Sequence, residues 1–321
     1  MSQVSSHRQT PAPKGVLKRL FGLLRLLGIV LFVVIMFRVD FPKLLDQLSR
    51  SSIELLLTGV AFQLIVLAAK GIRWHLMNEG KNEWTSWRLS LGRFYESYAI
   101  GVVTPARMGE LLKAGHEKGT GNVVASGIRV LAERGLDIGV FVILAGLSVL
   151  GGDYLDWSSF YGFVIVASGL FALFFSMLLL ASASFNRLLN SMMQKLPGKL
   201  AKTQITARRF SPLTASAIVL LSLISNISYF VSCYFLGLST GLDAGFIWTS
   251  GAVAVSGLLN MLPVTIMGVG TRELTFLYVF RSFPQALVLS FSFLVMLIAQ
   301  MGGGLVALLA GQLLLYSKSN K

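Results

Sequence analysis

Cysteine and histidine are both scarce in this sequence. The chain has one cysteine, Cys233, and three histidines, His7, His75 and His116. A single cysteine excludes an intrachain disulfide and a zinc site built from several thiolates. The histidines show no spacing typical of metal ligands, so we expect no metal and no cofactor. The motifs GxxxxGK[ST] and HExxH are absent as well, which argues against ATP-driven pumping by a P-loop and against zinc-protease chemistry.

Charged residues are few for a chain of this length. They make up 13% of the 321 residues, against roughly 25% in a soluble domain, whereas 54% of the residues are hydrophobic. Lys and Arg outnumber Asp and Glu by 28 to 14. The basic residues gather in a few loops between apolar segments, so they indicate topology and contact with anionic lipids at the cytoplasmic face, not nucleic-acid binding. We therefore predict an integral membrane protein.

Long apolar segments fill most of the chain after a polar tail at 1–15, which we expect to be disordered and cytoplasmic. The uninterrupted segments reach the roughly 20 residues needed to cross a bilayer. We predict an all-α, polytopic membrane helix bundle in a single membrane domain, 16–321, with about six full spans and two re-entrant hairpins. The segments lie at about 16–37, 53–72, 88–112 (interrupted), 123–150, 159–181, 213–237, 245–283 (interrupted) and 285–316.

Loop charges predict the orientation of these segments. The stretches 1–25 and 184–212 contain basic residues and no acidic ones, so they and both termini belong on the cytoplasmic side. The stretches 151–158 and 238–245 contain only acidic charges and belong outside. The two interrupted segments must then enter from opposite faces, which makes halves of about 16–150 and 159–316 an inverted repeat. The loop at 38–52, with three basic residues, fits this rule poorly.

The first interruption reads TPARMGE at 104–110. Pro105 and Gly109 break the helix, and Thr104 is expected to cap a new helix that begins at Pro105. Arg107 then lies in the first turn, with Glu110 three residues later and close enough to pair with it. A helix N-terminus beside an arginine is a favourable site for phosphate. The alternative is a kinked helix whose ion pair merely closes the kink.

The second interruption, at 262–273, repeats the same residue types. Its two glycines allow backbone conformations closed to other residues and permit close approach of a ligand. Thr271 is expected to cap the following helix, with Arg272 and Glu273 in its first turn. The alternative is a loop at the outer surface with a solvated Arg272. The residues of this motif are Pro263, Gly268, Gly270, Thr271, Arg272 and Glu273.

A third set of charges lies within the segment 123–150. Arg129, Glu133 and Asp137 are spaced i, i+4 and i+8 and share one helix face, with Arg134 about a third of a turn away. Ionised side chains facing lipid are prohibitive, so this face must look into the bundle, as a structural network or as part of a site. Glu96, in the first hairpin, is expected to line the same cavity.

The remaining polar residues suggest less. Lys70 and Arg73 are expected to extend from the end of the second span to the cytoplasmic interface, with their aliphatic stems in the bilayer. The alternative is that they bind substrate. Asn226, Asn260 and Gln300 lie inside apolar segments, where helix–helix hydrogen bonds explain them.

Taken as a set, these motifs resemble the flippase-like membrane region of lysylphosphatidylglycerol synthases and its stand-alone bacterial and archaeal relatives. The resemblance implies a multi-pass protein of the inner membrane that moves glycolipid, polyprenyl-phosphate or aminoacyl-phospholipid cargo between leaflets. Members that make lysyl-lipid carry a further soluble domain; the sequence ends at Lys321 without one, so we expect no aminoacyl transfer. The matching residues are Arg73-Trp74, Pro105-x-Arg107-x-Gly109-Glu110, Glu133-Arg134-x-x-Asp137, Pro263 and Gly268-x-Gly270-x-x-Glu273.

The functional hypothesis from the sequence is a lipid translocator without its own energy source. Its partners would be a membrane lipid substrate and, as an open alternative, a second copy of the chain or a lipid-modifying enzyme. The alternatives are a membrane-embedded enzyme, with Glu110 or Glu133 as base, and a scaffold for such an enzyme. The expected headgroup-binding residues are Arg107, Arg272, Thr104, Gly268, Gly270 and Thr271. The expected polar network, with possible proton exchange as an open role, is Glu110, Glu133, Arg134, Asp137, Glu273, Arg129 and Glu96.

Overall fold

The computed structural model describes residues 41–78, 87–115, 120–151, 159–181, 210–262 and 267–316, with single positions at 187, 191 and 194. The predicted tail at 1–15 and first span at 16–37 lie outside these ranges. Within them the chain forms helices and no strands, so the predicted all-α bundle is confirmed. The helices are α2 (Phe41–Ser49), α3 (Ile53–Asn78), α4 (Trp87–Val103), η1 (Pro105–Leu111), α5 (Leu112–Gly115), α6 (Thr120–Gly151), α7 (Ser159–Ala181), α9 (Pro212–Ser239), α10 (Phe246–Asn260), α11 (Thr271–Val279), α12 (Gln285–Leu294), η3 (Val295–Gly302) and α13 (Gly303–Tyr316).

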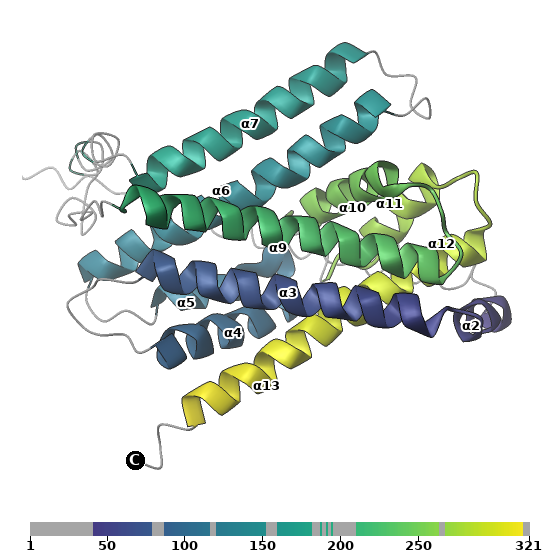
Figure 1. Ribbon diagram of the computed structural model, residues 1–321, viewed down its shortest axis with the longest axis horizontal. Coiled ribbons are helices and arrows are strands. Elements are labelled where there is room, and N and C mark those ends of the chain that lie inside the picture. The colour runs from purple at the N-terminus through teal and green to yellow at the C-terminus, as the bar shows by residue number, and fades with distance from the viewer. Residues whose placement is uncertain are drawn as a thin grey trace, which may run out of the picture.

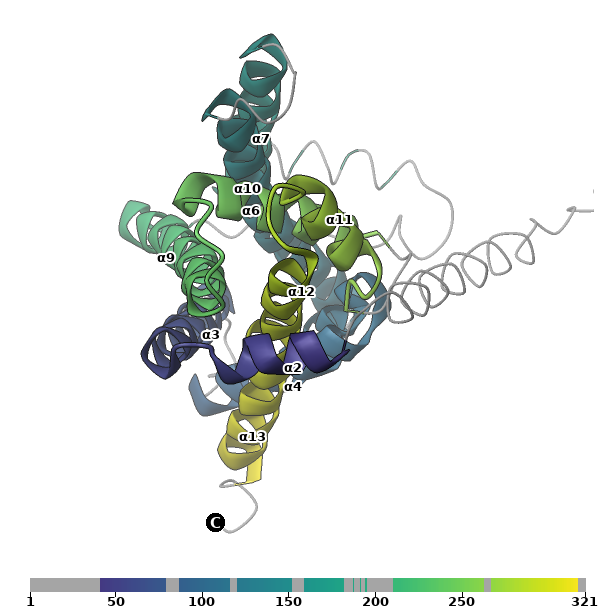
Figure 2. The same cartoon turned by 90° about the vertical axis from the view of Figure 1, so that its right-hand side faces the viewer.

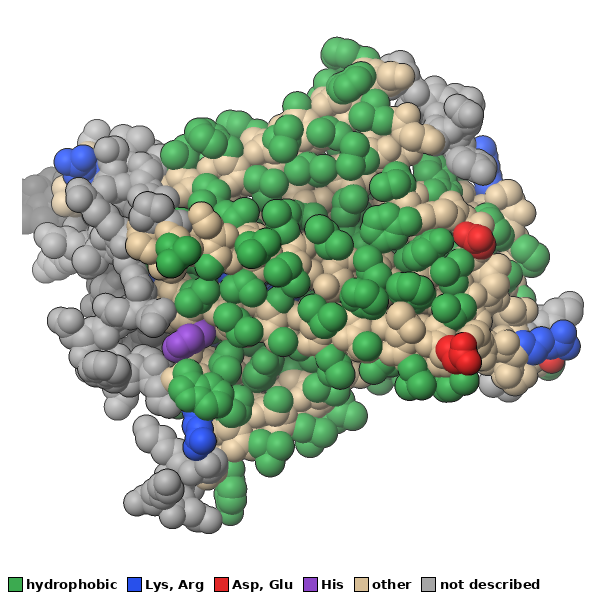
Figure 3. All heavy atoms as spheres, viewed as in Figure 1, with side chains coloured by type: hydrophobic (Ala, Val, Ile, Leu, Met, Phe, Trp, Pro, Cys, Tyr) green, Lys and Arg blue, Asp and Glu red, His purple; other side chains and the backbone are tan. Residues whose placement is uncertain are grey.

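Five helices of the described chain are long and apolar enough to cross a membrane. They correspond to the predicted spans other than 16–37, and the last one is continuous through α12, η3 and α13. Hydrophobic side chains cover the middle of the face seen in Figure 3, and the charged side chains on that face lie near its two ends. This distribution is the one expected of a bundle whose long axis crosses a bilayer.

The long helices run along the long axis of the molecule in alternating directions (Figure 1). In that view α3 runs from the right end, where α2 lies, to the left end, and α9 runs back beside it. The start of α3 and the end of α9 are joined by a hydrogen bond from the Ser52 amide to the Ser239 carbonyl, 3.0 Å. The helices α6 and α7 form a second antiparallel pair, and α7 lies at the outside of the bundle (Figure 2).

Glycines let α6 and α7 approach closely. A Cβ added at Gly139 would lie 2.7 Å from the Leu173 side chain and 3.0 Å from the Gly169 carbonyl oxygen. A Cβ added at Gly169 would in turn lie 2.8 Å from the Gly139 oxygen. The two backbones therefore touch, as in membrane helix pairs that associate through small residues. This contact holds α6, which carries the third charged motif, in place.

Two helical hairpins lie at opposite ends of the bundle. The first consists of α4, which begins at the left end in Figure 1, and the returning segments η1 and α5. The second consists of α10 and α11 at the right end. Each hairpin follows a long helix of its own half, α3 or α9, and precedes another, α6 or α12–α13.

The segment 38–52, predicted as a loop, contains the helix α2, so that prediction is wrong. In Figure 2 this helix lies across the end of the bundle. Leu48 packs against the main hydrophobic cluster, whereas Arg50 and Asp46 form an exposed ion pair of 2.8 Å on the other side. One apolar and one charged face let α2 rest on this end of the bundle without entering it.

Candidate functional site

The tip of the first hairpin is a tight turn at residues 104–107. Ala106 (φ 51°) and Arg107 (φ 54°) adopt the left-handed conformation, which is uncommon for residues other than glycine. Thr104 was predicted to cap a new α-helix, but the chain resumes as a kinked 3₁₀ segment. The Thr104 hydroxyl instead accepts a hydrogen bond from the Gly109 amide, 2.8 Å, and donates one to the Gly101 carbonyl, 3.1 Å. Thr104 therefore fastens the two arms of the hairpin together.

Gly109 was predicted as a helix breaker, and its role in the structure is close packing. A Cβ at this position would lie 2.6 Å from the Ile100 carbonyl carbon and 2.7 Å from the Gly101 amide nitrogen. Only glycine fits so near another backbone. Because η1 rests directly on α4 here, Glu110 reaches the interior, where it is 6% exposed.

The tip of the second hairpin also depends on left-handed residues. Gly268 has φ 72° and Gly270 has φ 87°, and Met267 precedes them with φ 58°. Thr271 was predicted to cap α11, but Gly270 is the capping residue and Thr271 is the first residue of the helix. Glu273 completes the cap, because its carboxylate accepts a hydrogen bond of 2.6 Å from the Gly270 amide. Pro263 lies outside the described residues.

Arg272 is buried and bound on all sides, which rules out a solvated arginine in an outer loop. It is 2% exposed. Its Nε donates to Ser292, 2.9 Å, and one terminal nitrogen contacts the Glu273 carboxylate at 2.6 Å. The other terminal nitrogen donates to the Met267 carbonyl and to the side chain of Gln300, both at 3.3 Å. Arg272 thus fixes the second tip to the last span.

Gln300 comes from an unusual part of that span. Residues Val295–Gly302, the segment η3, form a π-helix, a rare form that is found mostly as short bulges at functional sites. The neighbouring Ala299 carbonyl accepts a hydrogen bond of 2.8 Å from the side chain of Gln63 on α3. The widened turns therefore contact both α3 and the second hairpin.

A network of ion pairs links the first hairpin to α3 and α6. Arg73 lies at its centre, fully buried, and contacts Asp137 and Glu133 at 2.8 Å each. Lys70 also pairs with Asp137, at 3.0 Å. Lys70 and Arg73 were predicted to extend to the interface; the structure contradicts this, because α3 continues to Asn78 and both side chains turn inward. Of Lys70 and Arg73, the sequence resemblance included only Arg73, in the pair Arg73-Trp74, and Arg73 is the more deeply buried.

Glu110 and Glu133 extend the same network through Lys113. Lys113 forms ion pairs with Glu133 and with Glu110. Glu110 pairs in addition with Arg107, at 3.1 Å as the spacing predicted, and with Arg134. Sequence reasoning missed Lys113 because the interrupted segment was taken to end at 112. Its spacing of i+3 from Glu110 was the available signal.

Aromatic rings flank the cations of the first hairpin. The Lys113 ammonium lies 4.6 Å from the ring centre of Trp74 and 5.2 Å from that of Phe94. The Arg107 guanidinium lies 5.0 Å from the ring centre of Tyr98. These cation–π contacts add attraction for both cations.

Two predicted members of the network lie apart from its described ion pairs. Arg129 is 8% exposed and donates a hydrogen bond to Ser126 near the start of α6. Glu96 was expected to line the cavity, but it is not among the lining residues. The Glu96 backbone nitrogen packs instead beside Gly311, because α4 lies against α13. The face of α4 that carries Glu96 therefore contacts the last span.

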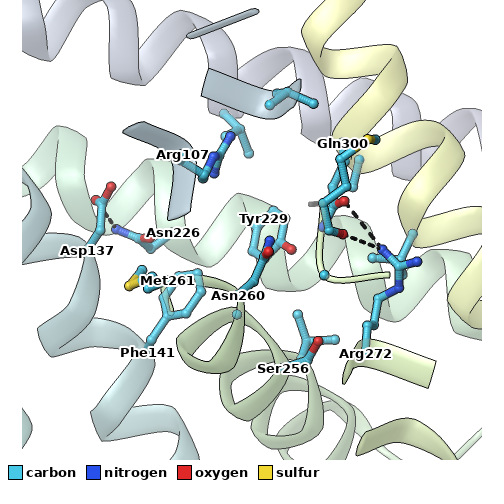
Figure 4. A pocket seen from close by; sticks show the side chains of 18 of the residues that line it. Arg107, Asp137, Phe141, Asn226, Tyr229, Ser256, Asn260, Met261, Arg272 and Gln300 are labelled. Atoms are coloured by element: carbon cyan, nitrogen blue, oxygen red, sulfur yellow. Dashed lines mark hydrogen bonds between the residues drawn. The ribbon is translucent and has the colours of Figure 1, made fainter. Parts of the chain in front are cut away.

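One cavity lies between the two hairpin tips (Figure 4). It encloses about 950 Å³, its open mouth included. Arg107 and Arg272 approach it from opposite sides, and Tyr229 and Asn260 lie between them in this view. Asn226, predicted to bond between helices, joins α9 to α6 through a 3.1 Å hydrogen bond to Asp137. The charged and polar residues of the lining are Lys70, Thr104, Arg107, Arg134, Asp137, Asn226, Ser256, Asn260, Arg272 and Gln300.

The structure thus brings Arg107, Arg272, Thr104 and Gly268 from the predicted headgroup set to one cavity, together with Arg134 and Asp137 from the predicted network. The second tip is held by residues that do not line the cavity, Gly270, Thr271 and Glu273. The first tip is likewise paired with carboxylates that do not line the cavity, Glu110 and Glu133.

Comparison with known protein families gives a match over most of the chain. The family described as the lysylphosphatidylglycerol synthase TM region matches residues 23–307 of the 321-residue chain. No curated protein matches the chain.

Proposed function

Because the chain belongs to the family of the lysylphosphatidylglycerol synthase transmembrane region, we propose that it moves a phosphate-bearing lipid between the leaflets of the cell membrane. In this proposal the headgroup passes through the central cavity while the acyl chains stay in the bilayer. The protein has no energy source of its own and changes no covalent bond. Its termini lie in the cytoplasm, as the loop charges predict.

The observation that carries the proposal is the meeting of two hairpin tips at one cavity. The first hairpin comes from one end of the bundle and the second from the other, and each contributes an arginine to the lining. Hairpins that enter from opposite faces and meet at a polar site are typical of transporters built from inverted repeats. Both hairpins are re-entrant in this proposal, and the cavity lies near the middle of the bilayer.

The two arginines differ in what holds them. Arg272 uses its donors on Ser292, Glu273, Gln300 and the Met267 carbonyl, and only 2% of its side chain is exposed. The Arg107 side chain is 26% exposed and is held by one ion pair, with Glu110, and by the ring of Tyr98. In the conformation described, Arg107 is therefore the arginine that a phosphate reaches, and Arg272 keeps the second tip closed. Proton exchange by the carboxylates stays a prediction.

A liposome assay tests the proposal. Purified protein is reconstituted with a phospholipid that carries a fluorophore on one acyl chain, and a membrane-impermeant reductant reports how fast inner-leaflet lipid reaches the outside. We expect Arg107→Ala to abolish this movement, because the phosphate loses the most exposed of the cations that line the cavity. Arg50→Ala is the matched control: Arg50 also pairs with one carboxylate, but its side chain is 72% exposed outside the bundle.

Wild-type rates in a well-folded Arg107→Ala protein would refute the proposal. An enzyme is distinguished by product formation in detergent, where no leaflets exist. A scaffold is distinguished by copurification of a stoichiometric partner and by full activity of that partner after the Arg107 substitution.

A further inference from the structure

The ion-pair network of the first hairpin carries more positive than negative charge. Ion pairs connect five cations and three carboxylates among the described residues, so two positive charges are in surplus. On the other side of the cavity, Arg272 and Glu273 balance each other. The connected residues are Lys70, Arg73, Arg107, Lys113 and Arg134 with Glu110, Glu133 and Asp137.

The surplus is presented to the cavity. Three of the cations line it, namely Lys70, Arg107 and Arg134, with side chains 14%, 26% and 19% exposed. The other two, Arg73 and Lys113, are at most 1% exposed and lie behind them. The three carboxylate side chains are at most 8% exposed, and Asp137 alone among them lines the cavity. A solute in the cavity therefore meets cations from α3, η1 and α6, with most of the balancing carboxylates hidden.

Uncompensated charges inside a membrane protein are costly, so a ligand that neutralises both is favoured. We infer that the site takes a phosphate group with two negative charges, a phosphomonoester, in preference to a phosphodiester. A phosphodiester supplies one negative charge and leaves one cation uncompensated. Zwitterionic and cationic headgroups bring an ammonium group into a positive cavity. This inference deepens the proposed function, and rests on it for the view that the phosphate belongs to a lipid.

Binding to the purified full-length chain in neutral detergent tests the inference by calorimetry. The probes are dioctanoyl phosphatidic acid, a phosphomonoester, dioctanoyl phosphatidylglycerol, a phosphodiester, and inorganic phosphate. The second phosphate charge interacts with surplus cations a few ångströms away, so we expect phosphatidic acid to bind at least about tenfold more tightly than phosphatidylglycerol. Equal affinities would overturn the inference.

A charge-count variant makes the test specific. Lys70→Gln removes one surplus charge, and Asp137 keeps Arg73 and Asn226 as partners, so the fold is expected to persist. The preference for phosphatidic acid should fall about tenfold, whereas Lys70→Arg should retain it. A preference that is unchanged in a folded Lys70→Gln protein would overturn the inference.

Three outcomes separate the inference from the proposed function. Preference for phosphatidic acid without lipid movement in liposomes supports the doubly charged site and overturns translocation. Equal movement and equal binding of both lipids support translocation and overturn the doubly charged site. Inorganic phosphate that binds as tightly as phosphatidic acid supports the site and shows that it takes free phosphate, with no contribution from the lipid.

Discussion

Replacing Arg73 by Gln removes the residue at the centre of the buried network. The substitution deletes ion pairs of 2.8 Å to both Asp137 and Glu133 and a 3.0 Å hydrogen bond to Ser222. Breaking a buried ion pair on one side typically costs 3–5 kcal/mol, because the partner charge is left without compensation. Asp137 keeps Lys70, and Glu133 keeps Lys113. We therefore expect a loss near the lower limit, about 3 kcal/mol, or a fall in unfolding midpoint on the order of 5–10 °C.

The measurement is thermal unfolding in detergent. Its readout is the loss of the monodisperse peak in size-exclusion chromatography after heating. Arg50→Gln is the control, since it breaks another arginine–aspartate pair whose side chains are 72% and 56% exposed. Its expected effect is below about 1 kcal/mol. The double variant Arg73→Gln, Asp137→Asn should recover part of the loss, because it also removes a carboxylate that has lost one of its two cationic partners. An Arg73→Gln midpoint equal to that of Arg50→Gln would show that water solvates the network.

Two further predictions concern the hairpin and the topology. Gly109→Ala places a Cβ within 2.7 Å of the α4 backbone and should lower the stability by about 1–3 kcal/mol, whereas Gly127→Ala, with nothing within 4 Å, should be neutral or stabilising in the same unfolding assay. The sole cysteine, Cys233, is 0% exposed, so the native chain should not react with an impermeant maleimide. Asp243→Cys should then be labelled in intact spheroplasts and Ser211→Cys only after lysis; the reverse pattern would contradict the orientation.

Sequence reasoning located the hairpin tips because Pro and Gly are so unfavourable inside a spanning helix. It also predicted the Arg107–Glu110 pair, which depends only on spacing along one segment. It did not predict the capping residues correctly. Whether Thr104 caps a new α-helix or begins a left-handed turn depends on how closely η1 packs on α4. The cap at Gly270 is one residue from the predicted one for a similar reason.

The partners of the charged residues could not be predicted in the same way. The spacing of Glu133 and Asp137 shows that they share a helix face, but not which helix that face meets. Their central partner, Arg73, is about 60 residues away along the chain and lay beyond the predicted end of its span. Lys113 followed the predicted end of the hairpin by one residue. Both errors come from helix boundaries, which hydropathy places only within a few residues.

The π-helical segment η3 has a consequence for the register of the last span. An α-helix turns by about 100° per residue, and a π-bulge accommodates roughly one extra residue in its wider turns. If Val295–Gly302 were α-helical, α13 would be rotated about the helix axis relative to α12 by about 100° from its present orientation. Two contacts therefore depend on the register that η3 sets. One is the contact of α12 with Arg272, through Ser292, and the other is the contact of α13 with α4, through Gly311. Deleting one residue from this segment would rotate one of these two contacts out of place, although the span would remain long enough and apolar enough to cross the membrane.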